Sequence, residues 1–255
     1  MEPAETTVVR GIKLRGGPAR EACFVVAQVH TEMRSAADMS DKSQRDMMHR
    51  ECNQEILSLE IAAQSLVDFP NTPWELRMHL ARQCWDEARH AQLRFRRLKE
   101  LGGFKGEFPI INQEWAVVCM LDSLPARLAV QNRTFEAGSL DGLASASRSW
   151  RDIGDTQTAE MIESILVDEI QHVRFANDWL KRMTKENPRT LLDIASAIRR
   201  VESIIEALSP RLGNMSLDGV ELAKIKRDVA ANVDDRRAAG FTDEEIAEIL
   251  RKESR

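Results

Sequence analysis

Two segments of the sequence share one local pattern, DEARH at residues 86–90 and DEIQH at residues 168–172. In both, a glutamate that follows an aspartate stands three residues before a histidine. Residues three apart in an α-helix lie on one face, so each glutamate can bind a metal ion together with its histidine. One such pair arises by chance in many helical proteins, whereas two copies in one chain indicate a repeated metal-binding motif.

The first motif lies in the second of two predicted long helices. Apolar residues recur at three- and four-residue steps from about residue 41 to 69, and Pro70 favours an end to this helix. At residues 72–75 (TPWE), an N-cap threonine, a proline at the first helical position and a capping-box glutamate predict the start of the next helix. The glycine pair at residues 102–103 predicts its end.

The second motif lies in the last of four predicted long helices. Residues 104–111 contain glycine and proline and predict an extended segment. A third helix is expected over residues 112–137, with Pro125 as a kink or short break, followed by a shorter helical piece. Asp155 predicts the start of a fourth long helix that ends near residue 184.

These helices predict a single all-α domain over residues 1–255. The chain has only 12 glycines and 8 prolines, and strand-like runs are missing from it. The core bundle is expected at about residues 42–184, with flanking helices at about 18–37 and 188–255. A further capping box at residues 242–245 predicts the start of the last helix.

The other two long helices each contain a glutamate set among apolar residues, Glu60 and Glu136. Glu60 precedes Glu87, and Glu136 precedes Glu169, by a step comparable to the length of one long helix with its connection. Such separations suit two positions that face each other across an antiparallel helix pair. The four helices therefore offer, in chain order, Glu, Glu-x-x-His, Glu and Glu-x-x-His.

From about Asn53 to Leu180 the sequence resembles ferritin-like proteins, and among them most closely the bacterial family catalogued as domain of unknown function 455. The resemblance rests on five stretches: LEIAAQSLVDFP (59–70), WDEARHAQLRFRRLKELGG (85–103), GEFP (106–109), RTFEAGSLD (133–141) and VDEIQHVRFANDWL (167–180). It implies a ferritin-like four-helix bundle with additional N- and C-terminal helices and a centre of two metal ions.

The ligands that this resemblance implies are Glu60, Glu87, His90, Glu136, Glu169 and His172. The first three would hold one ion and the last three the other, with one glutamate of each motif able to bridge the two ions. Four carboxylates buried together repel one another unless cations balance them. Carboxylates with one imidazole per ion suit two irons, an iron with a manganese, or two manganese ions, without excluding zinc.

Two aspartates stand directly before the motif glutamates, Asp86 and Asp168. There they can accept a hydrogen bond from the free ring N–H of a ligand histidine. The remaining histidines, His30, His49 and His79, lack this context, and we interpret them as packing or surface residues.

The DEARH segment also resembles the second-helix motif of bacterial multicomponent monooxygenases and soluble acyl-carrier-protein desaturases. That resemblance implies an oxidase or oxygenase that uses dioxygen as co-substrate to oxidise a small organic molecule, with an external electron donor. The absence of tyrosine argues against a ribonucleotide reductase radical subunit, and the absence of a CxxC pair argues against a complete rubrerythrin-type peroxidase. The alternatives are a ferroxidase or metal-handling protein without an organic substrate, a helical interaction protein with a vestigial site, and an enzyme that hydroxylates a transfer RNA base.

Helical phase suggests which side chains line a substrate cavity. Each lies about one turn from an expected ligand: Gln64, Gln83, Cys84, Arg94 and Arg133. A cation at Arg133 would attract an acidic or amino-acid-like substrate. Alternatively, Arg133 forms a salt bridge with Asp86, Asp168 or a ligand glutamate.

The net charge of -5 argues against a nucleic-acid partner, which requires a basic face. The sequence has no apolar segment of about 20 residues, which is the length that spans a bilayer, and no secretory signal at its start. We therefore expect a cytoplasmic protein with no membrane partner. The helices predicted at residues 188–255 would close a substrate pocket, form a homodimer interface, or simply pack on the core.

Overall fold

The computed structural model describes residues 6–9, 11–27, 38–208 and 230–253. Most of these residues are helical, which confirms the predicted all-α helical fold. The chain divides into two compact units, one of residues 1–127 with 195–211 and one of residues 128–194 with 212–255. The single domain expected from the sequence stays a prediction.

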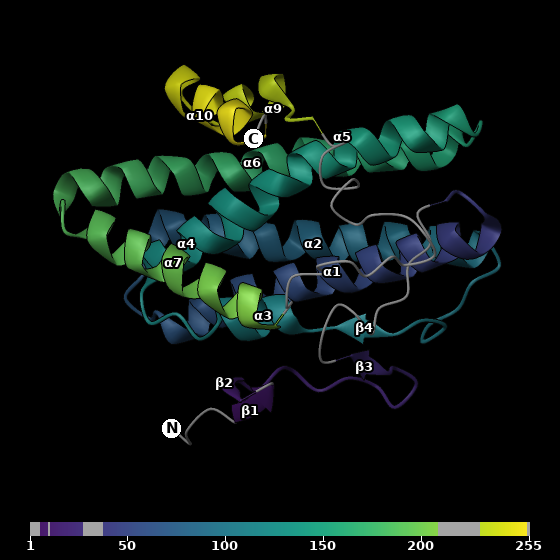
Figure 1. The fold of residues 1–255 in the computed structure, drawn as a ribbon, viewed down its shortest axis with the longest axis horizontal. Coiled ribbons are helices and arrows are strands. Elements are labelled where there is room, and N and C mark those ends of the chain that lie inside the picture. The colour runs from purple at the N-terminus through teal and green to yellow at the C-terminus, as the bar shows by residue number, and fades with distance from the viewer. Residues whose placement is uncertain (1–5, 10, 28–37, 209–229, 254–255) are drawn as a thin grey trace. The chain divides into compact units, whose positions relative to one another are not determined.

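The first unit is built on the long helices α1 (Asp41–Asp68) and α2 (Trp74–Glu100), which lie side by side (Figure 1). The short connection between them makes the pair antiparallel. Leu57 of α1 and Leu76 of α2 are completely buried. Pro73, not the predicted Thr72, occupies the N-cap position of α2, since the Thr72 hydroxyl donates instead to the Phe69 carbonyl at 2.7 Å.

Short strands accompany this helix pair, although the sequence shows no strand-like run. β1 (Thr6–Val9) and β2 (Ile12–Arg15) form an antiparallel hairpin. β3 (Val26–Ala27) pairs in parallel with β4 (Ile110–Ile111). Strands of two residues carry no detectable periodicity, and partners so distant in the chain are chosen by tertiary packing.

The predicted N-terminal helix at residues 18–37 is not found at residues 18–27, which run without helix into β3. Gly16, Gly17 and Pro18 precede this stretch and favour irregular backbone. Residues 28–37 lie outside the described part of the chain.

The predicted third helix consists of several pieces: α3 (Gln113–Val118), α4 (Leu124–Val130), a π-helix η2 (Gln131–Glu136) and α5 (Ala137–Asp152). The predicted break at Pro125 occurs just before that residue, which then stands in the first turn of α4, where proline is tolerated. The Arg127 side chain stabilises the break by donating to the carbonyls of Leu121 at 3.1 Å and Cys119 at 3.0 Å.

The second unit is built on α5 and α6 (Thr156–Glu186), which pack along one another. Asp155 caps α6 as predicted, since its carboxylate accepts from the Thr158 N–H at 2.9 Å. Buried apolar residues of both helices, among them Leu140 and Ile162, form the core between them.

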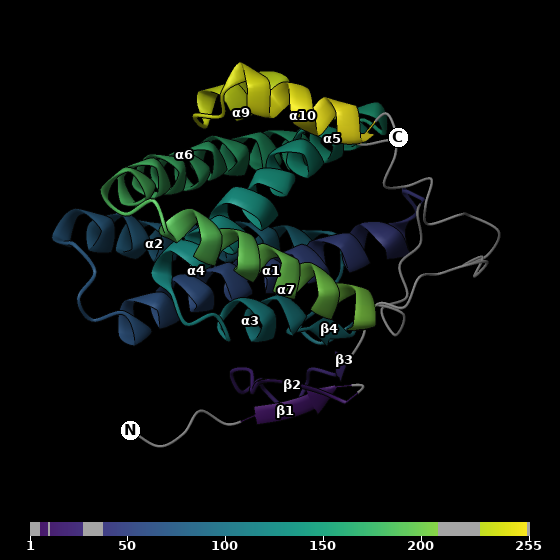
Figure 2. The ribbon, with the colours of Figure 1, turned by 60° about the vertical axis from the view of Figure 1, so that its left-hand side comes forward.

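The described residues after α6 form α7 (Thr190–Leu208), α9 (Val233–Ala238) and α10 (Asp243–Glu253). The predicted capping box at α10 is present: the Thr242 N–H donates to Glu245 at 2.9 Å, and the Glu245 N–H donates to the Thr242 hydroxyl at 3.2 Å. Both views show α9 and α10 lying along α5 and α6 (Figures 1 and 2). No helix in the described ranges is long and apolar enough to cross a bilayer.

Candidate metal centre

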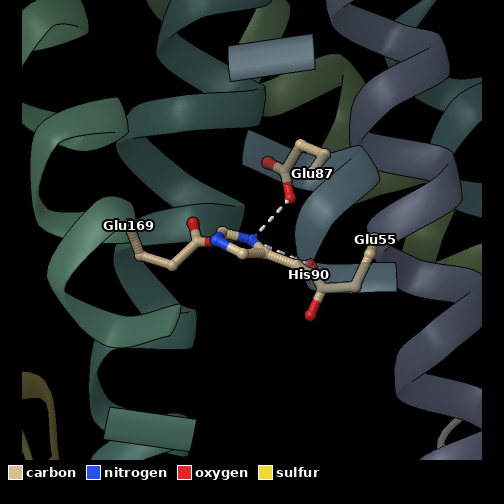
Figure 3. A group of neighbouring side chains, drawn as sticks. All are labelled: Glu55, Glu87, His90 and Glu169. Carbon is tan, nitrogen blue, oxygen red and sulfur yellow. Dashed lines mark hydrogen bonds and ion pairs between the residues drawn. The ribbon is translucent and has the colours of Figure 1, made fainter. Parts of the chain in front are cut away.

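In the first unit, three side chains bring potential metal ligands together: Glu55 of α1, and Glu87 and His90 of α2 (Figure 3). One ligand atom from each lies within 4.8 Å of the others. His90 Nδ1 is 3.2 Å from a Glu87 oxygen and 3.7 Å from a Glu55 oxygen. All three side chains are buried, so the carboxylates are shielded from water.

Glu55, and not the predicted Glu60, is the α1 carboxylate of this group. Glu60 forms a two-pronged ion pair with Arg20 at 2.6 and 2.8 Å. Five residues turn an α-helix by about 500°, so the two glutamates of α1 face directions about 140° apart, and only one can face α2. The sequence spacing contained a signal for Glu55. The separation between Glu55 and Glu87 is close to that between Glu136 and Glu169, whereas Glu60 lies too near Glu87.

A buried arginine accompanies the first group. Arg94 lies one turn after His90 on α2, is 2% exposed and donates through Nε to Glu55. Its Nη2 is 3.7 Å from a Glu51 oxygen. Arg94 was predicted to line a substrate cavity, and the structure places it directly against a potential metal ligand.

In the second unit, Glu136, Glu169 and His172 form a corresponding group. One ligand atom of each lies within 4.8 Å of the others, and His172 Nδ1 is 3.5 Å from a Glu169 oxygen. All three are nearly inaccessible to solvent. Glu136 accepts hydrogen bonds from the side-chain amides of Asn132 at 2.7 Å and Gln131 at 3.4 Å, which fix the orientation of its carboxylate.

Glu136 is the last residue of η2, and this π-helix was not predicted. A π-helix contains one extra residue in its turn. Within η2 the Thr134 side-chain hydroxyl donates at 2.9 Å to the Ala129 carbonyl, five residues back. Such bulges occur frequently at functional sites. They leave no mark in a 3.6-residue periodicity, so helical phase alone misplaces side chains on either side of them.

The aspartates that precede the motif glutamates have different surroundings. Asp86 is buried and accepts from Arg82 Nε at 2.8 Å through both oxygens, a contact that the sequence did not predict. Asp168 is half-buried on α6. A bond from either residue to a ligand histidine stays a prediction.

The residues predicted to line a substrate cavity make other contacts. Gln64 donates to Asp68 at 2.8 Å, and the Cys84 thiol faces the Leu59 carbonyl at 3.7 Å. Gln83 is buried on α2.

Arg133 donates to Asn177 and to Glu245, and its guanidinium lies 4.7 Å from the centre of the Phe241 ring. The alternative of a salt bridge to an aspartate or a ligand glutamate is therefore replaced by an ion pair with a residue of α10.

The donor types of both groups fit a hard divalent cation. Each group offers two buried carboxylates and one imidazole, and buried carboxylates need a balancing positive charge. Burial and the charge of Glu55 raise the pKa of the nearby Cys52 thiol to about 11. Burial likewise raises the pKa of Cys119 to about 12, so both thiols stay protonated at neutral pH.

The comparisons with known proteins identify a family and no more. The model of a family described as "Protein of unknown function (DUF455)" matches residues 5–247. The comparisons with curated proteins and with solved structures found no match. Since the match covers nearly the whole sequence, the chain belongs to the DUF455 family of proteins of unknown function.

Proposed function

We propose that this protein is an oxidoreductase that binds two metal ions, iron or iron with manganese, and uses dioxygen to oxidise a small organic molecule. One observation carries the proposal: each compact unit by itself gathers two buried glutamates and one histidine. In the proposal, Glu55, Glu87 and His90 hold one ion. The second ion is held by Glu136, Glu169 and His172.

The donor chemistry supports iron and manganese over softer metals. Carboxylate oxygens with a single imidazole suit these ions, and zinc and copper sites in proteins draw more on histidine and thiolate. When bound in the reduced state, the two ions supply electrons to dioxygen, and an external donor has to restore them for a further turnover.

The remaining roles belong to side chains of this chain. Arg94 holds the Glu55 carboxylate, and Asn132 and Gln131 hold that of Glu136. Preoriented ligands bind an ion without the cost of ordering at the moment of binding. Burial of both groups excludes bulk water, which favours directed oxidation over leakage of reactive species. Support for an organic substrate comes from the resemblance of DEARH to monooxygenase and desaturase motifs.

The first experiment is metal analysis of the purified chain, followed by anaerobic loading with Fe²⁺ and rapid mixing with oxygen. We expect two ions per chain and an oxygen reaction whose rate changes when a substrate is present. Uptake of many irons per chain would instead identify an iron-handling protein. Absence of uptake would contradict the proposal.

A matched pair of variants tests the ligand assignment. Glu55→Gln should weaken the binding of one ion by about a hundredfold or more, since even partners that only touch a ligand contribute 10–100-fold. Glu60→Gln makes the same change five residues away on α1 and should leave binding intact, because Glu60 is paired with Arg20. The reverse result would return Glu60 to the ligand set.

A further inference from the structure

Arg133 connects the second ligand group to the C-terminal helices. It belongs to η2, three residues before Glu136, and donates to Asn177 of α6 and to Glu245 of α10. Asn177 is completely buried and donates to the Ala239 carbonyl at 2.8 Å. One cation therefore joins η2, α6 and α10.

Apolar packing joins the C-terminal segment to α6 and to α5, which begins directly after η2. A buried cluster contains Ala137 and Val173, the residues directly after the ligands Glu136 and His172. From the C-terminal segment, the cluster contains Ala239, Phe241 and Ile246. The segment of α9 and α10 thus packs against residues that directly follow two of the three potential ligands in the sequence.

Further hydrogen bonds hold this segment on α6. Lys181 donates to the Gly240 carbonyl at 2.7 Å, and Arg174 donates to the Ala238 carbonyl at 2.6 Å. Ala238 is the last residue of α9 and Gly240 lies in the turn that follows, so two bonds from α6 hold the end of α9 and the turn in place.

Because Glu136 lies at the end of the π-helix η2, contacts that stabilise η2 also affect the direction of the Glu136 side chain. An isolated π-turn is less favourable than an α-turn and persists where its surroundings stabilise it. If η2 reverted to α-helical bonding, residues on its two sides would rotate by about 100° relative to each other. Glu136 would then turn away from His172. Contacts that fix Arg133 oppose this reversion.

We propose that Arg133 is a positioning residue, which uses the docked C-terminal helices to hold η2 in the register that points Glu136 at the metal. The inference rests on the metal site proposed above and assigns the α9–α10 segment a role in metal affinity. The ion pair with Glu245 and the stacking on Phe241 are the contacts through which it acts.

Glu245→Gln tests the ion pair with little other change. Glutamine has the same shape and also serves at the third position of a capping box, so α10 keeps its start while Arg133 loses its charged partner. Mn²⁺ titration of the whole chain should show about tenfold weaker binding of one of the two ions, which corresponds to about 1.4 kcal/mol. Glu244→Gln, an exposed neighbour on the same helix, is the matched control and should bind as the unsubstituted chain does.

Two further measurements separate positioning from general stability. In a His172→Ala background, the remaining ion belongs to the first ligand group, and Glu245→Gln should not alter its affinity. Arg133→Met should weaken binding as Glu245→Gln does, and the double variant should be no weaker than either single one, because both remove the same interaction. Arg133→Lys, which keeps the cation, should recover part of the affinity.

Two glycine substitutions provide an independent test of the docked turn. Gly240 and Gly154 have nearly the same left-handed φ, +87° and +85°, and alanine strains both equally. Gly240→Ala disturbs the docked turn and should weaken the same ion, whereas Gly154→Ala, between α5 and α6, should not.

The outcomes distinguish this inference from the proposed function. Uptake of two ions with unchanged affinity in Glu245→Gln and Arg133→Met would overturn the positioning role alone. An equal loss of affinity for both ions would overturn it as well, since that marks general destabilisation. No metal uptake by the unsubstituted chain would overturn the proposed function, and this inference with it.

Discussion

At the scale of single residues, Arg94 neutralises Glu55, a buried carboxylate of the candidate metal centre. Their ion pair is almost fully buried, at 2% and 9% side-chain exposure. Removing one member of a buried pair costs about 3–5 kcal/mol, because the other charge is left uncompensated. Arg94 thus stabilises the metal-free fold, while its charge competes with a cation for Glu55.

Arg94→Met should therefore destabilise the metal-free chain by about 3 kcal/mol, and added Mn²⁺ should raise its Tm more than it raises that of the unsubstituted chain. The reason is that the ion supplies the positive charge that the variant lacks. Thermal unfolding with and without Mn²⁺ measures both effects. Arg96→Met, at an exposed position of the same helix, should change neither, and equal metal-induced increments in all chains would contradict the competition.

At the scale of elements, Asp68 ties the end of α1 to β2 and α4. Its carboxylate accepts from Arg15 and Arg127, each at 2.5 Å, and from Gln64 at 2.8 Å. A carboxylate at a helix C-terminus is normally unfavourable, and the two arginines outweigh this. Burial alone would raise the pKa of Asp68, but the bonds from Arg15, Arg127 and Gln64 lower it below its usual value.

The sign of the resulting pH dependence follows from this lowered pKa. The ionised Asp68 stabilises the fold fully above the pKa of about 3.9 that it has in the unfolded chain. That contribution is lost as the pH falls through the lower pKa of the folded state. Asp68→Asn should reduce the unfolding free energy at neutral pH by about 2 kcal/mol and flatten its decline below pH 4.

Urea unfolding between pH 2.5 and 7 tests this expectation. Asp152→Asn is the matched control, since Asp152 is also the last residue of a helix, α5, but is exposed. It should leave stability unchanged or slightly higher, because it removes an unfavourable charge from a helix end. A decline for Asp68→Asn as steep as that of the unsubstituted chain would contradict the role of this carboxylate.

At the scale of the whole molecule, metal should act as a stabiliser of the fold. Each unit buries two glutamates beside a histidine, and ions that bind only the folded chain raise its stability. At a free concentration 100 times Kd, each ion contributes about 2.7 kcal/mol. Treatment with a chelator should lower the Tm, and Mn²⁺ should restore it. Scanning calorimetry tests this, and a Tm indifferent to metal would contradict binding at both groups.

Local sequence was sufficient to predict α1, α2, α6 and α10, several helix ends and the paired motifs, but the helix expected at residues 18–27 is absent. Helix periodicity, capping and the step from glutamate to histidine are local properties, so Asp155, Thr242 and the two motifs could be interpreted without a structure. The structure brings five of the six predicted ligands into the two groups: Glu87, His90, Glu136, Glu169 and His172.

Three features were decided by tertiary packing alone. They are the α1 glutamate that joins the ligand groups, the position of the extra residue in η2, and the ion pair between Arg133 and Glu245. The rotation of α1 about its axis is set by its packing on α2, which selects Glu55 although Glu60 has the more apolar neighbours in the sequence. The π-helix shifts the phase of every residue after it, and the partner of Arg133 lies 112 residues along the chain. These features depend on energies summed over contacts between residues distant in sequence, and local sequence patterns carry no information on such contacts.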